Sequence, residues 1–230
     1  MKKTRKILAM AACAILLVCI SVGATVAYLT STDSVTNTFT VGKVAITLDE
    51  AKVDVNGAVV TPAERVEANT YKLMPGHSYV KDPTVHFAAG SEASWLFVKV
   101  ENGISTIEGD YDGETDIEQQ IQNASNGWTE LLYIRNEDDE VTATVYYKKV
   151  DANTTNYAID YKVFDGFKIM DDIEAVPSDP SKKDVDKTYL DDFSDKRIVV
   201  TAYAVQQDGF ATAKEAWDAT FGKSTSSEGE

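Results

Sequence analysis

The sequence predicts a mostly β fold, an antiparallel β-sandwich of the jelly-roll type with one or two short peripheral helices. Three observations support this fold class. Several segments alternate apolar and polar residues with a period of two, which is typical of strands with one buried face. Glycine-containing turn dipeptides separate these segments. No strand pattern alternates with long amphipathic helices, so a parallel sheet is not expected.

The alternating segments define three expected strands, at residues 44–49, 95–100 and 157–163, and enrichment in Val, Tyr and Thr predicts two more, at 142–150 and 197–205. In the first of them, Ile46 and Leu48 alternate with Thr47 and Asp49. Such a strand places its apolar side chains on one face of a sheet and its polar side chains on the other. We therefore expect sheets that pack face to face over an apolar core.

Dipeptides with a preference for chain reversal lie between the strands: Asn56-Gly57, Pro75-Gly76, Asn102-Gly103 and Asp165-Gly166. Two short helices are expected near 116–124 and 211–221. In the second helix, Ala213, Trp217 and Phe221 recur at helical spacing. We expect this helix to cap an open end of the sandwich, with core packing favoured over a ligand surface for its aromatic stripe.

The N-terminus has the pattern of a secretory signal at residues 1–27. Four basic residues precede an apolar run that ends in small residues. Cleavage is expected between Ala27 and Tyr28, and an uncleaved membrane anchor is the alternative. Cys13 and Cys19 both lie in the signal, so the mature chain contains no cysteine.

The mature chain divides into three parts by composition. Residues 28–41 form an N-terminal segment that is a candidate donor strand, 42–222 form the β-sandwich domain, and 223–230 form a small, polar, disordered tail. The proline-containing stretch 176–183 is expected to be a surface loop within the one domain.

The mature chain is strongly acidic. Removal of the four basic signal residues from the 22 in the whole chain leaves 18, against 37 acidic residues and thus a net charge of −19. Such a surface repels nucleic acid and anionic lipid, and it attracts cations. We therefore expect no nucleic-acid partner and no stable membrane anchor after cleavage, and we expect calcium or acid to favour self-association.

No enzyme signature is present. The two histidines, His77 and His86, are not in an H-E-x-x-H pattern, which would place two zinc ligands beside a base on one helix. No serine lies in a G-x-S-x-G turn, and a thiol nucleophile is impossible without a mature cysteine. The sequence predicts a protein that is not an enzyme and has no catalytic residue.

A weak calcium candidate is formed by Asp110, Asp112 and Asp116, because closely spaced carboxylates on a loop can surround a hard cation. The segment departs from the EF-hand pattern, since glycine is fourth rather than sixth and no glutamate is twelfth. A solvated acidic turn is the favoured interpretation, and calcium is the only cofactor considered.

A family resemblance appears at the start of the mature chain. The string from Gly23 to Asp33 combines an apolar signal end, an aromatic residue after the cleavage site and a Ser/Thr/Asp run, and it continues as N-T-F-T-V-G-K-V from Asn37. This region resembles the TasA/camelysin family, which Gram-positive bacteria export through a SipW-type signal peptidase. Segments 73–85 and 202–217 add support, whereas 103–196 offers no match.

The resemblance implies a jelly-roll protein that is secreted into the biofilm matrix or onto the cell surface and assembles into fibres. Its implied partners are further copies of itself, the SipW-type signal peptidase during export, and other matrix proteins. In such fibres the N-terminal segment of one subunit completes a sheet of its neighbour, with Val35, Phe39 and Val41 filling a groove. The alternative is an ordinary first strand folded onto its own domain.

Two other functions are kept as alternatives. A monomeric surface adhesin or binding module would show an exposed aromatic patch, including Trp95, Trp128 or Tyr147. A camelysin-like metalloprotease is less favoured, because the chain has no recognisable zinc motif.

Overall fold

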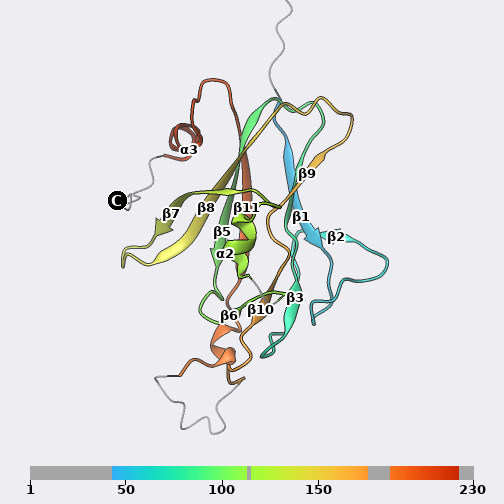
Figure 1. Cartoon of the computed structure of the whole chain (residues 1–230), viewed down its shortest axis with the longest axis vertical. Helices are drawn as coiled ribbons and strands as arrows, with labels where there is room; N and C mark the ends of the chain where they lie inside the picture. Colours follow the sequence, from blue (N-terminus) through green and yellow to red (C-terminus); the bar gives the residue numbers. More distant parts are fainter. Residues whose placement is uncertain (1–42, 113–114, 176–186, 223–230) are drawn as a thin grey trace, which may run out of the picture. The chain divides into compact units, whose positions relative to one another are not determined.

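The computed structural model describes residues 43–112, 115–175 and 187–222, and it is mostly β with antiparallel sheets (Figure 1). Several predictions concern residues outside these ranges. They are the signal 1–27 with its Ala27–Tyr28 cleavage site, the segment 28–41 with Val35, Phe39 and Val41, the loop 176–183 and the tail 223–230.

The strands form three sheets in which every ladder is antiparallel. The first sheet has the order β2 (Arg65–Val66), β1 (Ile46–Ala51), β4 (Thr84–Phe87) and β9 (Ile159–Lys162). The second has the order β3 (Ser78–Val80), β10 (Gly166–Ile169) and β6 (Glu108–Gly109). The third has the order β11 (Ile198–Gln206), β5 (Ser94–Asn102), β8 (Val141–Val150) and β7 (Thr129–Arg135).

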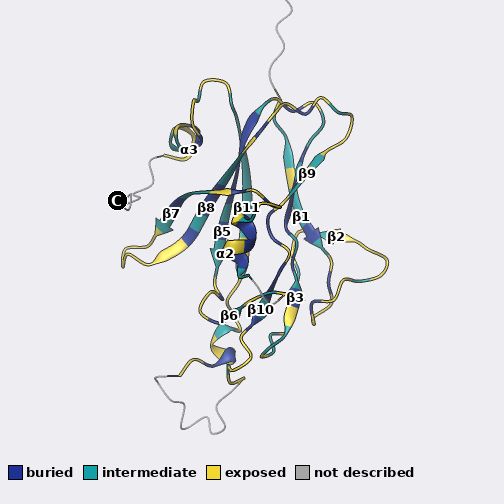
Figure 2. Ribbon diagram, in the orientation of Figure 1, coloured by how far each residue is buried: buried dark blue, intermediate teal, exposed yellow. Residues whose placement is uncertain are grey.

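The five expected strands are confirmed as β1, β5, β8, β9 and β11. The central strand β5 differs from the expectation, because both of its faces are buried (Figure 2). Leu96 and Val98 belong to the main core between the sheets. Trp95 and Phe97 point the other way, into a second apolar cluster.

That second cluster is where α3 (Ala213–Phe221) packs. Trp217 lies against Phe97, with ring centroids 5.3 Å apart. The helix therefore covers the outer face of the β11-β5-β8-β7 sheet, and the prediction that it caps an end of the sandwich is wrong. Thr212 begins the helix with a capping box, because its hydroxyl accepts from the Glu215 N–H while the Glu215 carboxylate accepts from the Thr212 N–H.

The other expected helix is confirmed as α2 (Ile117–Gln122), and a short 3₁₀ helix, η2 (Leu190–Phe193), precedes β11. Gly57 and Gly76 in the predicted turns have φ of +80° and +69°, a backbone conformation that glycine adopts at little steric cost. Asp165-Gly166 is not a hairpin, because β9 and β10 belong to different sheets. Among the described residues, no helix has the length and apolarity needed to cross a bilayer.

Candidate functional site: a groove between β1 and β11

Two strand edges face each other without pairing. β11 ends its sheet, and within the described part of the chain no strand pairs with its outer edge. On one edge, β1 pairs with β4 from Ile46 to Asp49. On its other edge, β2 pairs only with Glu50 and Ala51, so the rest of that edge is open. β1 and β11 contact each other with no ladder between them. Unpaired strand edges of this kind are templates for a further strand.

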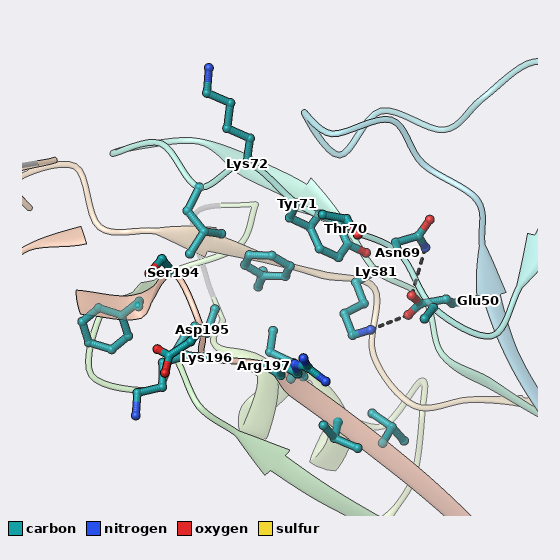
Figure 3. Close-up of a pocket in the computed structure, with 18 of the residues that line it drawn as sticks. Glu50, Asn69, Thr70, Tyr71, Lys72, Lys81, Ser194, Asp195, Lys196 and Arg197 are labelled. Atoms are coloured by element: carbon teal, nitrogen blue, oxygen red, sulfur yellow. Dashed lines mark hydrogen bonds and ion pairs between the residues drawn. The ribbon is translucent and has the colours of Figure 1, made fainter. Parts of the chain in front are cut away.

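A cavity of about 980 Å³ opens between these edges (Figure 3). One side is formed by Leu48–Glu50 and by the segment 67–73, and the other by most of 190–200, which includes η2 and the start of β11. Ile104 and Phe167, both buried core residues, also line it. The cavity is thus bounded by apolar core on the inside and by the two open edges.

The strand faces toward the core are apolar but incompletely covered. Ile46 and Leu48 of β1, and Ile198 and Val200 of β11, pack against the main core and are only half-buried. An added strand with apolar side chains on one face would remove this surface from water. Burial of apolar surface stabilises by about 25 cal/mol per Å².

A buried polar cluster lies in the wall of the groove. Glu50 is 3 % exposed and Lys81 is 8 % exposed. One oxygen of the Glu50 carboxylate accepts from the Lys81 ammonium, and the other accepts from the Asn69 side-chain amide at 2.9 Å. Tyr71 lies beside them and donates its hydroxyl to the Val80 carbonyl at 3.1 Å. Burial, and then the Glu50 charge, raise the pKa of Tyr71, so its hydroxyl stays protonated.

A second charged network lies on the β1-β4-β9 sheet. The His86 ring contacts Asp49 through Nε2 at 2.8 Å and Asp160 through Nδ1 at 2.6 Å. Arg65 also bonds to the Asp49 carboxylate and reaches Asp82 at 3.2 Å. Burial opposes the charge on His86, but its two hydrogen bonds to carboxylates outweigh that effect and raise its pKa. The network joins strands β1, β2, β4 and β9.

The structure separates the roles of the calcium candidates. Asp116 caps α2, since its carboxylate accepts from the Gln119 N–H at 2.8 Å. Asp110 and Asp112 are exposed. The described residues contain no group of three or more His, Cys, Asp or Glu side chains placed to hold a metal ion.

The aromatic residues considered for an adhesin surface are largely used by packing. Trp95 and Trp128 are 6 % and 2 % exposed, and Tyr147 packs against the second cluster. Trp128 also donates its indole N–H to the Lys162 carbonyl at 2.8 Å. These three residues therefore do not form an exposed patch.

Sequence reasoning missed the cluster of Glu50, Asn69 and Lys81. A buried lysine gives no local signal, because Lys81 follows a short strand and precedes a proline-containing loop as an exposed lysine would. The ion-pair partner of Lys81 also gives no local signal, because Glu50 lies 31 positions earlier in the chain.

Comparisons of the chain with protein-family models, with curated proteins and with solved structures found no match.

Proposed function

We propose that this chain is a secreted structural protein of the bacterial cell surface or biofilm matrix, and that it self-assembles by strand exchange. In this proposal, residues 28–41 of one copy occupy the groove between β1 and β11 of another and complete a jelly-roll-type sandwich. The observation that carries the proposal is the pair of unpaired strand edges around a cavity that reaches the core residues Ile104 and Phe167.

The length of the segment suits the groove. β11 has nine residues, which span about 30 Å as a strand. The segment 28–41 can extend to about 45 Å at the same rise per residue. It is therefore long enough to follow the whole of β11 and still connect to its own domain.

The pattern of the segment also suits the groove. Val35, Phe39 and Val41 lie four and two positions apart, so in an extended strand they share one face, together with Asn37. Thr36 and Thr40 fall on the opposite face. One apolar face toward the core and one polar face toward solvent is what a strand added at a sandwich edge requires.

The test compares the mature chain, residues 28–230, with a chain that starts at Gly42. Light scattering and negative-stain microscopy should show filaments or large oligomers for the longer chain and monomers for the shorter one. Equal behaviour of the two chains as monomers, under acid, calcium and high concentration, would overturn the proposal.

Two matched variants sharpen the test. Phe39→Ser removes the largest apolar side chain of the segment and should abolish assembly, whereas Thr40→Ser on the opposite face should leave it intact. A synthetic peptide of residues 28–41 should bind the chain that starts at Gly42 in isothermal calorimetry. Equal effects of the two substitutions would contradict the assignment of faces.

The acidity of the surface leads to a further expectation. Assembly brings chains of net charge −19 together, so neutralisation of carboxylates by acid or screening by calcium should promote it. Equal assembly at neutral pH with a chelator present would show that charge repulsion does not control it.

A further inference from the structure

We propose that Lys81 and Asn69 are a modification site at which the chain forms an intramolecular isopeptide bond, with Glu50 as the proton-transfer group. The inference does not depend on the proposed function. It rests on a single buried carboxylate that contacts a lysine ammonium through one oxygen and an asparagine amide through the other (Figure 3).

The orientation of the Asn69 amide is fixed by its neighbours. The Val53 backbone N–H donates to Asn69 Oδ1 at 2.9 Å, so that atom must be the acceptor. The Asn69 Nδ2 then donates to Glu50 Oε1 at 2.9 Å and to the Ala51 carbonyl at 2.8 Å. The oxygen of the Asn69 amide is therefore bound by the Val53 N–H, and its nitrogen is bound by the Glu50 carboxylate.

These contacts match the groups that amide exchange requires. The Lys81 Nζ is the nucleophile once Glu50 has taken one of its protons. Attack of Nζ on Asn69 Cγ forms the C–N bond and places negative charge on Oδ1, where the Val53 N–H stabilises it. Glu50 returns the proton to the leaving Nδ2, the Cγ–Nδ2 bond breaks, and the departing ammonia takes the second proton from Nζ, so that it leaves as an ammonium ion.

The reaction balances without a further reactant. A lysine ammonium and an asparagine amide give a secondary amide and an ammonium ion, and no electron is transferred. Glu50 begins and ends as a carboxylate. The cavity that Glu50, Asn69 and Lys81 line offers a route for ammonia to leave.

The reacting groups are shielded from water. Lys81 and Glu50 are both less than one-tenth exposed, and the Tyr71 ring lies beside them. Few water molecules can therefore compete with the Lys81 amine for the Asn69 amide carbon.

The product would join the segment before β3 to the residue that follows it. Asn69 and Lys81 lie on either side of that strand, and Asn69 also bonds to β1 residues that border the groove. The cross-link would hold this wall of the groove in place under force or denaturant.

The first measurement is the intact mass of the full chain after export and signal cleavage. The expected mass is lower than the sequence mass by one ammonia molecule. An unchanged mass would overturn the proposal, and loss of a water molecule instead would assign the bond to Lys81 and Glu50 and also overturn the role of Asn69.

Tryptic mapping supplies the decisive readout, because an asparagine that cyclises to a succinimide also loses ammonia. Asn56, Asn102 and Asn126 each precede glycine and are candidates for that reaction. The isopeptide bond predicts a branched peptide in which Val66–Lys72 is joined to Leu73–Lys99, with no cleavage after Lys81. Ammonia loss without the branched peptide would overturn the proposal.

Three variants test the assigned roles. Lys81→Arg keeps the positive charge, and Asn69→Ser replaces the amide with a hydroxyl that can accept a hydrogen bond. Each variant should have the full mass calculated from its own sequence. Glu50→Gln retains the lysine and the asparagine and should also lack the branched peptide. Full cross-linking in Glu50→Gln would refute its role as the proton-transfer group.

Discussion

The helix α3 provides the sharpest test of the packing described above. Trp217 is 4 % exposed, and its ring lies 5.3 Å from Phe97, 5.8 Å from Tyr203 and 4.4 Å from Phe221, measured between centroids. Replacement of a buried tryptophan by alanine costs about 3–5 kcal/mol from lost burial and the cavity it leaves. We expect Trp217→Ala to lower the free energy of unfolding by about 4 kcal/mol.

The magnitude follows from what the residue holds in place. A helix of nine residues is not stable in water by itself, so α3 depends on its contact with the sheet. Loss of the Trp217 side chain also uncovers Trp95 and Phe97 on the outer face of β5. A domain has only about 5–15 kcal/mol of net stability, so this one change removes a large part of it.

The matched control is Phe221→Ala in the same helix. Phe221 is 42 % exposed, and its loss should cost only about 1 kcal/mol. Urea denaturation followed by far-UV circular dichroism measures both variants without relying on tryptophan fluorescence. If Trp217→Ala costs no more than Phe221→Ala, the aromatic stripe is not a packing surface, and the alternative of a ligand surface gains weight.

Three further predictions concern polar side chains that hold the strands together. The hydrogen bonds to Asp49 and Asp160 raise the pKa of His86 above 6.5, so His86 stabilises the fold below that pH and loses this effect as the pH rises through the raised pKa. His86→Gln should therefore cost about 1 kcal/mol near pH 6 and little near pH 9. An equal cost at both pH values, measured by urea denaturation, would refute the assignment. Burial raises the pKa of Glu108 from 4.5 to about 7, so the fold binds this proton more tightly than the unfolded chain and stability falls as the pH rises between those values. Glu108→Gln should flatten this pH dependence by up to about 3 kcal/mol, and an unchanged profile in the same assay would contradict it. Asn153 is 1 % exposed and donates to the Phe87 and Tyr157 carbonyls at 2.9 Å. Asn153→Ala should cost about 2 kcal/mol, because the carbonyl of the buried residue Phe87 loses its donor, whereas a thermal midpoint equal to that of the unsubstituted chain would show that water replaces the amide.

The sequence by itself determined the local structure. Period-two alternation located β1, β5 and β9, because a strand with a buried face must place its apolar residues on alternate positions. Enrichment in Val, Tyr and Thr located β8 and β11. Turn chemistry located the reversals at Gly57 and Gly76, since only a residue without a β-carbon adopts positive φ at little cost. The helix α3 was predicted from Ala213, Trp217 and Phe221, because residues that recur at the helical period share one face of a single element.

Only the tertiary structure decided which residues meet across the fold. The partners of His86 lie 37 and 74 positions away, and those of Glu50 lie 19 and 31 positions away. Likewise, β5 is buried on both faces because α3, more than a hundred residues later, returns to cover it. Periodicity reports the faces of one element, whereas sheet order and layer packing determine what covers each face, and these depend on contacts that no local pattern encodes. The groove and the Glu50, Asn69 and Lys81 cluster are products of that second level.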